Sequence, residues 1–344
     1  SAHGLLRGMY DWFNSSSYLG RMLHGGNATN GLPGGPLVYL SPVGKDEDLV
    51  VTQRYYDQDY WMVELANREP LCLSHYPGER PHCYDLLGLE AFVDEYRATG
   101  AAKYLDAVKG GWAIYRDNYR HIGGATAIME GLEVFPPKSY YIAERRVGET
   151  CGSVFWIQIN SRLLNLYPDQ EQYAEEIEES IYNVILANQD QDGNIRYYSN
   201  LQGTKQQAGC KNTCCEVSSS GLIGSLPELI YSIADDGLYV NLFAPSDITW
   251  SHSGHVVTLV TTTDFPFDPY VSINLSTRTQ TRTQTRTQTR MKIRIRVPAW
   301  ATGPMAIKVN GTDYGVGIPG RFTVLDREWS DNDRIEFSLP IGFR

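Results

Sequence analysis

The segment Asn-Thr-Cys-Cys-Glu at residues 212–216, together with Gly-Glu-Thr-Cys at residues 148–151, decides how this chain is interpreted. Zinc accepts thiolates and carboxylates together and prefers four ligands in a tetrahedron. The two segments supply four such groups, those of Glu149, Cys151, Cys214 and Cys215. The Glu-x-Cys and Cys-Cys spacings differ from those of zinc fingers and zinc ribbons. The residue types therefore allow one zinc site built from two distant parts of the chain.

Helix geometry limits how these residues can converge. Side chains at positions i and i+2 of a helix point to nearly opposite sides. Glu149 and Cys151 can therefore share a metal only where the chain enters or leaves a helix. The same holds for Cys214 and Cys215, which precede a helix-like run at residues 222–233. We expect a metal between the ends of two helices. The alternative is that these cysteines are inert buried side chains, and spacing alone slightly favours that alternative.

Length, charge and cysteine usage bound the class of protein. A chain of 344 residues can bury a large core and predicts two domains. Its net charge of -10 argues against nucleic acid or an anionic membrane as a partner. No apolar run approaches the roughly 20 residues that span a bilayer. The start lacks Met and a signal peptide, which predicts a fragment. The six cysteines do not form a compact disulfide framework, so the compartment stays open, with the cytoplasm slightly favoured over secretion.

The periodicity of apolar residues changes near residue 236. In residues 1–236 the apolar residues mainly recur at helical spacing. Residues 86–115 have the pattern helix, Ala-Thr-Gly turn, helix. Beyond the Asp-Asp-Gly segment at residues 235–237 the pattern alternates, which predicts strands. We therefore predict a helical domain over residues 1–236 and a β-sandwich over residues 237–344.

In these two halves the chain resembles glycoside hydrolase family 127, which contains zinc-dependent β-L-arabinofuranosidases. The resemblance spans nearly the whole chain in order, and its specific motif is Glu-Thr-Cys followed later by Cys-Cys. Weaker matches are Gly-Gly at 123–124, Glu-Val-Phe at 133–135, Tyr-Tyr-Ser-Asn-Leu at 197–201, Asp-Gly-Leu-Tyr-Val at 236–240, Arg-Val-Pro-Ala-Trp at 296–300, Val-Asn-Gly at 309–311 and Arg-Glu-Trp at 327–329. The resemblance implies an (α/α)6 barrel, incomplete here at its N-terminal side, followed by a β-sandwich domain truncated at its C-terminal side.

The resemblance also implies a mechanism. It identifies Glu149, Cys151, Cys214 and Cys215 as ligands of Zn2+ and the thiolate of Cys214 as the nucleophile that attacks the anomeric carbon. A metal and a helix N-terminus lower the pKa of a cysteine from about 8.5 into the neutral range. A thiolate would then stand where most retaining glycosidases use a carboxylate.

The general acid/base and the sugar contacts are likewise implied by the resemblance. Glu133 fits the expected acid/base better, and Glu130 is the alternative; either needs burial to raise its pKa. His3, His82 and Tyr198 match positions that contact the sugar. The sequence after the double Cys and the Pro-Pro segment at residues 136–140 depart from many relatives, so the accepted sugar can differ from β-L-arabinofuranose.

Three functions therefore fit the sequence. The first is a retaining glycosidase acting on an oligosaccharide or a glycoprotein glycan. The second is a carbohydrate-binding or scaffold protein, because four protein ligands with no open position are typical of a structural zinc. The third is a glycosidase that uses two carboxylates and no metal. A homodimer is compatible with each of them.

Overall fold

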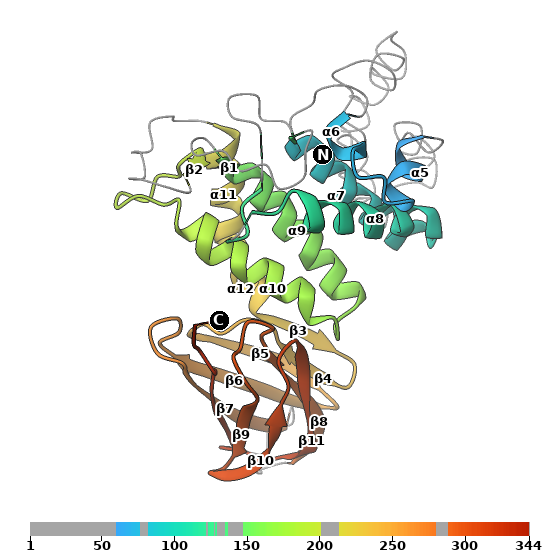
Figure 1. Ribbon diagram of the computed structural model, residues 1–344. Coiled ribbons are helices and arrows are strands. Elements are labelled where there is room, and N and C mark those ends of the chain that lie inside the picture. The colour runs from blue at the N-terminus through green and yellow to red at the C-terminus, as the bar shows by residue number, and fades with distance from the viewer. Residues whose placement is uncertain are drawn as a thin grey trace, which may run out of the picture. The chain divides into compact units, whose positions relative to one another are not determined.

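The computed structural model describes residues 60–75, 82–121, 123–126, 128, 135–136, 147–200, 213–279 and 288–343 (Figure 1). The chain divides into two compact units. The first comprises Ser1–Arg162 and Glu179–Gly221, and the second comprises Leu163–Glu178 and Leu222–Arg344. Helices dominate the described part of the first unit and strands that of the second, which agrees with the predicted α plus β class. Among the residues described, no helix has the length and apolarity that crossing a membrane requires.

The described part of the first unit contains helices that the sequence predicts and others, such as α5 (Trp61–Ala66) and α6 (Cys72–His75), that it does not. In chain order they are α5, α6, α7 (His82–Thr99), α8 (Ala102–Asn118), the start of α9 (Thr150–Leu166), the end of α10 (Glu171–Ser180), the π-helix η2 (Ile181–Leu186) and the start of α11 (Cys214–Ser225). The predicted helix–turn–helix is confirmed, with Gly100 at φ +70° ending α7. Gly110 lets α8 approach α5, because a Cβ there would lie 1.7 Å from the carbonyl oxygen of Leu65.

Buried aromatic side chains fix helix α9, which carries Cys151, against α8. Trp112 of α8 stacks on Trp156 of α9, with ring centroids 5.9 Å apart. The Nε1 group of Trp112 donates a hydrogen bond of 2.8 Å to Oδ1 of Asn160, and Nδ2 of Asn160 donates to the carbonyl of Trp156. Large apolar rings and a satisfied polar pair therefore pack the part of α9 beyond its first turn against α8.

A buried ion cluster between α7 and α9 predicts a pH-dependent stability. Arg162 pairs with Glu90 at 2.8 Å and with Asp94 at 3.1 Å. Burial raises the pKa of Glu90 from 4.5 to about 7, against the opposing effect of the Arg162 charge. The folded state therefore holds a proton that the unfolded state releases. This stabilises the folded state below pH 4.5, and the contribution is lost as the pH rises through about 7.

We therefore expect Glu90→Gln to leave the free energy of unfolding nearly unchanged at pH 5. At pH 8 the variant should be more stable than the wild type, by up to about 3 kcal/mol. Urea unfolding of the intact chain at both pH values measures this. Asp106→Asn, at an exposed position on α8, is the control and should show no such pH dependence. Equal effects of Glu90→Gln at both pH values would contradict the prediction.

The second unit contains two sheets. The six-stranded sheet has the order β10-β9-β12-β7-β6-β5, and the four-stranded sheet has the order β11-β8-β4-β3. Their strands are β3 (Tyr231–Ala234), β4 (Gly237–Val240), β5 (Ser246–His252), β6 (His255–Thr263), β7 (Tyr270–Thr279), β8 (Thr289–Val297), β9 (Met305–Val309), β10 (Thr312–Gly317), β11 (Arg321–Trp329) and β12 (Arg334–Ser338). Strands β4 and β8 are parallel, whereas the other pairs within these two sheets are antiparallel.

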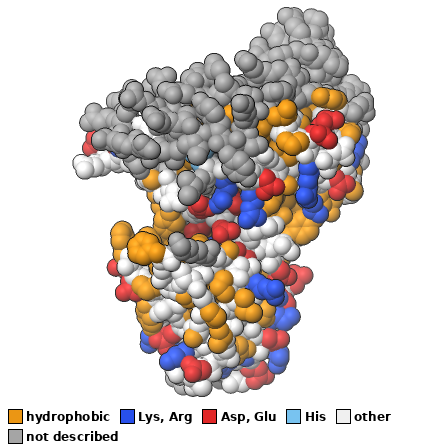
Figure 2. Space-filling model, viewed as in Figure 1, with side chains coloured by type: hydrophobic (Ala, Val, Ile, Leu, Met, Phe, Trp, Pro, Cys, Tyr) orange, Lys and Arg blue, Asp and Glu red, His pale blue; other side chains and the backbone are white. Residues whose placement is uncertain are grey.

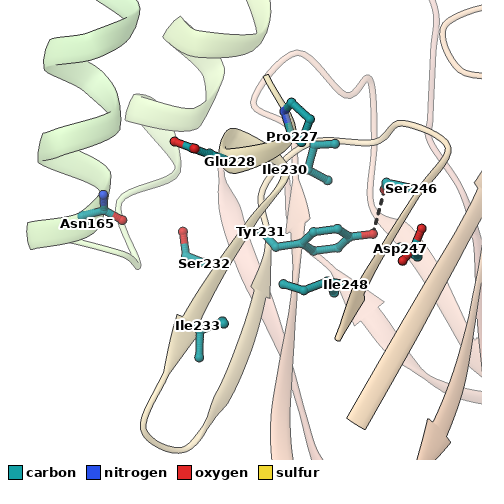
Figure 3. Close-up of a pocket in the computed structure, with 10 residues that line it drawn as sticks. All are labelled: Asn165, Pro227, Glu228, Ile230, Tyr231, Ser232, Ile233, Ser246, Asp247 and Ile248. Atoms are coloured by element: carbon teal, nitrogen blue, oxygen red, sulfur yellow. Dashed lines mark hydrogen bonds between the residues drawn. The ribbon is translucent and has the colours of Figure 1, made fainter. Parts of the chain in front are cut away.

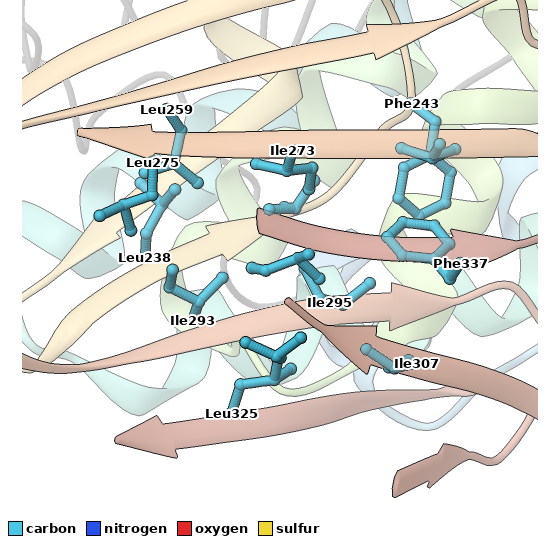
Figure 4. Close-up of a cluster of buried hydrophobic side chains, with 14 of the residues drawn as sticks. Leu238, Phe243, Leu259, Ile273, Leu275, Ile293, Ile295, Ile307, Leu325 and Phe337 are labelled. Atoms are coloured by element: carbon cyan, nitrogen blue, oxygen red, sulfur yellow. The ribbon is translucent and has the colours of Figure 1, made fainter. Parts of the chain in front are cut away.

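Side chains of both sheets form one hydrophobic cluster (Figure 4). Leu238 and Ile295 come from the four-stranded sheet, whereas Leu259, Ile273 and Phe337 come from the six-stranded sheet. Strand β9 alternates buried and exposed residues, as a strand with one covered face must. On the visible face of this unit, positive and negative side chains are interspersed with hydrophobic ones (Figure 2).

One sequence expectation near the start of this unit was wrong. The helix-like run predicted over residues 222–233 ends earlier, because α11 stops at Ser225 and the short helix α12 covers only Pro227–Ile230. From Tyr231 the chain forms strand β3, which pairs with β4 across the turn at residues 235–236. Pairing with a neighbouring strand overrides the helical periodicity of this apolar segment.

Candidate metal centre

The four residues predicted as metal ligands lie together in the first unit. The ligand atoms of Glu149, Cys151, Cys214 and Cys215 are all within 4.8 Å of one another. Glu149 ends the short strand β1 (Val147–Glu149), and Cys151 lies in the first turn of α9. Cys214 and Cys215 are the first two residues of α11. The ligands therefore come from the starts of two helices, which is the only arrangement that their spacing allows on regular helices.

The backbone before α9 explains how Glu149 and Cys151 face the same point. Strand β1 pairs with β2 (Tyr198–Ser199) through an irregular register in which Glu149 is opposite Tyr198. Gly148 has φ +64°, a conformation that strains other residues. The chain thus changes from strand to helix between the two ligands, so both side chains can reach one ion.

The four donor atoms could hold a single metal ion. Three sulfurs and one carboxylate form a donor set that favours zinc over hard ions such as magnesium or calcium. With metal–ligand distances of roughly 2.0–2.3 Å, donor atoms of a tetrahedron lie roughly 3.3–3.8 Å apart. Sγ of Cys215 lies 3.6 Å from Oε1 of Glu149. This one distance therefore already has the length that such an ion requires, and all the donor atoms lie within 4.8 Å of one another.

Contacts within the cluster shift the pKa values of its three thiols. The pKa of Cys151 is lowered to about 6, first by the side-chain hydrogen bond with Cys215 and further by that with Ser218, whose hydroxyl lies 3.4 Å from Sγ of Cys151. The hydrogen bond between Cys151 and Cys215, with burial and the charge of Cys151, raises the pKa of Cys215. Burial, followed by the charge of Cys151, raises the pKa of Cys214. A cation would reverse these last two effects, so metal binding releases protons and strengthens as the pH rises.

Cys214 differs from the other ligands in its exposure. Glu149, Cys151 and Cys215 are buried, whereas Cys214 is exposed. The hydroxyl of Tyr197 lies 3.7 Å from Sγ of Cys214. Burial, followed by the nearby charge of Glu149, raises the pKa of Tyr197, so its hydroxyl keeps its proton and can donate it to a thiolate. Cys214 is thus the exposed sulfur of this cluster.

Two of the predicted sugar contacts lie beside the metal centre. His82, the first residue of α7, is fully buried, and its Nδ1 lies 3.7 Å from Oε2 of Glu149. Tyr198 is opposite Glu149 in the β1–β2 pair, and its ring centroid is 4.5 Å from that of Tyr197. A contact of either residue with sugar stays a prediction. His3, Glu130 and Glu133 lie outside the residues that the structure describes.

Sequence analysis missed two residues that contact the sulfurs. Tyr197 precedes the predicted Tyr198 and is the one of the pair with a hydroxyl at Cys214. Ser218 lies one helical turn after Cys214, and its hydroxyl is 3.4 Å from Sγ of Cys151. Residues three or four apart share a helix face, so the spacing from Cys214 could have pointed to Ser218.

A separate cavity lies within the second unit (Figure 3). Its volume is about 320 Å³, and its lining includes Tyr231, Ile233, Ile248 and the carboxylates of Glu228 and Asp247. In Figure 3 the hydroxyl of Tyr231 points to Ser246, with which it shares a hydrogen bond of 2.9 Å. The lining contains no thiol, no histidine and none of the predicted site residues. This cavity is therefore not the candidate metal centre.

Comparison with known proteins connects this geometry to a family. The model described as "Beta-L-arabinofuranosidase, GH127 catalytic domain" matches residues 38–226, which is more than half of the chain. The model described as "Beta-L-arabinofuranosidase, GH127 middle domain" matches residues 237–341. The chain belongs to glycoside hydrolase family 127. The predicted membership is thus confirmed, and the Glu/Cys3 cluster lies within the part that matches the catalytic domain.

The chain is also similar to individual proteins of family 127. The chain is 25% identical over 267 residues to a non-reducing end β-L-arabinofuranosidase of Bifidobacterium longum subsp. longum. This match covers 72% of this chain and 39% of that protein. The solved structure of a family 127 β-L-arabinofuranosidase from Geobacillus stearothermophilus T6 has a TM-score of 0.73 at 20% identity, covering 98% of this chain and 61% of that one. Another family 127 β-arabinofuranosidase has a TM-score of 0.74 at 18% identity, covering 92% and 51%. The chain therefore spans less than two thirds of each of these relatives.

Proposed function

We propose that this chain carries the catalytic centre of a retaining glycosidase that releases β-L-arabinofuranose from an oligosaccharide or a glycoprotein glycan. The observation that carries the proposal is the exposure of Cys214 in a cluster whose other three ligands are buried. A nucleophile must reach its substrate, whereas the ligands of a purely structural ion need no exposed member. Membership of family 127 and the similarity to named β-L-arabinofuranosidases support the choice of sugar.

In this proposal Glu149, Cys151, Cys214 and Cys215 hold Zn2+, whose charge keeps the thiols ionised at neutral pH. Sγ of Cys214 bonds to the anomeric carbon as the glycosidic bond breaks. Glu133, or Glu130 as the alternative, gives its proton to the departing oxygen and later takes one from the attacking water. Water then replaces the sulfur, and two inversions give net retention.

The other residues bind or orient. Tyr197 donates its hydroxyl to Sγ of Cys214, which stabilises that sulfur as a thiolate and as a leaving group. His3, His82 and Tyr198 are the proposed sugar contacts. The helical part, which we place at residues 1–236, would form part of an (α/α)6 barrel, and the two sheets of residues 237–344 a β-sandwich. A cytoplasmic location and a homodimer stay predictions.

One observation favours the second candidate, a carbohydrate-binding or scaffold protein. The four donors within 4.8 Å can fill all positions of a tetrahedral ion, which is the usual form of a structural site. In such a site all four side chains would hold the ion, and catalysis would in addition need Sγ of Cys214 to be free to bond to the anomeric carbon. The two candidates therefore differ in whether bound sugar is released.

The test combines metal analysis with turnover of the purified chain. Metal analysis should find about one zinc per chain. The chain should hydrolyse an aryl β-L-arabinofuranoside, and NMR during the reaction should detect the β-anomer as the first product. The aryl α-L-arabinofuranoside is the control substrate and should not be cleaved. Zinc with oligosaccharide binding but no sugar release would favour the binding protein. Turnover by a chain that holds no zinc would favour the glycosidase with two carboxylates.

A further inference from the structure

The residue between the two upstream ligands is anchored by several hydrogen bonds. Thr150 lies between Glu149 and Cys151 and is fully buried. Its backbone amide donates a hydrogen bond of 3.0 Å to the carbonyl of Tyr197. Its hydroxyl lies 2.8 Å from the carbonyl oxygen of Arg196 and 3.1 Å from that of Tyr197, and donates its proton to this pair of acceptors. Thr150 thus ties the start of α9 to the segment that ends in Tyr197.

Asn188 completes the contacts of this hydroxyl. Its Nδ2 group donates a hydrogen bond of 2.8 Å to Oγ1 of Thr150, and Asn188 is fully buried. Two residues before it, the π-helix η2 ends at Leu186. A π-turn contains an extra residue, so it rotates the residues that follow relative to an α-helix, and such turns are frequent at functional sites. Here the rotated residue is the one that meets the metal-ligand segment.

The segment between Asn188 and Tyr197 is itself closed into a rigid loop. The amide of Arg196 donates to the carbonyl of Asn188 at 2.9 Å, and Gln189 forms a bridge with Ile195. At the tip, Oδ1 of Asp190 accepts the amides of Asp192 and Asn194, each at 2.9 Å. The loop therefore holds Thr150 from both of its ends, through the side chain of Asn188 and the carbonyls before Tyr198.

We propose that Asn188 and Thr150 are positioning residues of the metal centre, which fix the strand-to-helix turn so that Glu149 and Cys151 face one ion. Neither side chain is a ligand; each acts through the backbone that carries the ligands. The inference rests on the proposed metal-dependent function and adds residues that lie outside its ligand set. Partners of this kind commonly change metal affinity 10–100-fold when they are removed.

The test measures zinc affinity of the full chain by competition with a chromophoric chelator. Thr150→Val replaces the hydroxyl by a methyl group of similar size, and Asn188→Ala removes the donor. We expect each to weaken zinc binding about 10–100-fold. Thr150→Ser keeps the hydroxyl and should bind zinc nearly as tightly as the wild type. If Asn188→Ala does not fold, the comparison of Thr150→Val with Thr150→Ser decides.

Asn160→Ala is the matched control. Asn160 is also fully buried, lies on the same helix α9 and makes two side-chain hydrogen bonds of 2.8 Å, but it contacts no ligand segment. The variant Asn160→Ala should lower the melting temperature without weakening zinc binding. In the cobalt-substituted protein, the sulfur-to-cobalt absorption should change in Thr150→Val and stay unchanged in Asn160→Ala.

The outcomes separate the two proposals. A wild-type chain that binds no zinc overturns the metal centre and the positioning role together. If the wild type binds zinc and Thr150→Val and Asn188→Ala bind it equally well, only the positioning role is overturned. Weakening by Asn160→Ala as large as that by Thr150→Val would likewise overturn it, because general destabilisation would then account for both.

Discussion

Cys214→Ala is expected to lower kcat for an aryl β-L-arabinofuranoside on the order of 10^4- to 10^6-fold, as removal of a nucleophile does in other hydrolases. Cys214 is the exposed sulfur of the cluster, and its Sγ is the atom to which the hydroxyl of Tyr197 points at 3.7 Å. Alanine offers no atom that can bond to the anomeric carbon. The measurement is steady-state hydrolysis together with the zinc content of each variant.

A labelling experiment distinguishes the role of Cys214 as nucleophile from its role as metal ligand. Cys214 is also a predicted ligand, so loss of zinc alone could lower turnover. An electrophilic β-L-arabinofuranose analogue that alkylates the nucleophile should label the peptide containing Cys214 and Cys215, and fragmentation should place the sugar on Cys214. Cys72, a buried thiol outside the cluster, gives the control variant Cys72→Ala, which should keep full activity. Full turnover by Cys214→Ala, or a label on Cys215, would contradict the assignment.

The sequence was informative where covalent spacing alone restricts geometry. Glu149 and Cys151 are two residues apart, which is incompatible with a shared ion inside a helix, so a helix start could be predicted there. The same argument applied to Cys214 and Cys215, and the structure places both pairs at helix starts. The change from helical to alternating periodicity also predicted the strands beyond residue 236.

Sequence was uninformative where the outcome depends on contacts between distant segments. Tyr197 and Tyr198 are chemically identical neighbours, and only the pairing of β2 with β1 decides which hydroxyl reaches Cys214. Asn188 is 38 residues from Thr150 in sequence, and its orientation depends on the π-turn before it. The sequence predicts helix where strand β3 forms, because the helical periodicity of this segment does not reveal its pairing with β4.

A large effect on stability is expected from Arg296, a buried arginine of the second unit. Arg296 of β8 is fully buried and binds two carboxylates of helix α10, Glu171 at 2.6 Å and Glu178 at 3.0 Å. Nε1 of Trp300 donates to the same oxygen of Glu178 at 2.6 Å. Arg296 and Trp300 are the first and last residues of the Arg-Val-Pro-Ala-Trp motif at residues 296–300. The motif therefore has a physical reason, because both of its ends donate hydrogen bonds to Oε2 of the buried Glu178.

Arg296→Met is expected to lower the free energy of unfolding by about 3–5 kcal/mol, because it leaves two buried carboxylates without their cation. Chemical unfolding of the intact chain, followed by tryptophan fluorescence, measures the loss. Arg334→Met is the matched control, since Arg334 pairs with Glu336 at 2.6 Å in the same unit but is 47% exposed, and it should lower the stability far less than Arg296→Met does.

A triple variant distinguishes an unpaired charge from lost packing. Arg296→Met combined with Glu171→Gln and Glu178→Gln removes all three charges while it keeps the side-chain volumes, and it should recover most of the stability. If the triple variant is as unstable as Arg296→Met alone, the shape of the guanidinium rather than its charge holds α10 to the sheet. If Arg296→Met costs no more than Arg334→Met, the buried ion cluster contributes nothing beyond an exposed pair. The side of α10 that faces β8 would then be held by its apolar residues alone.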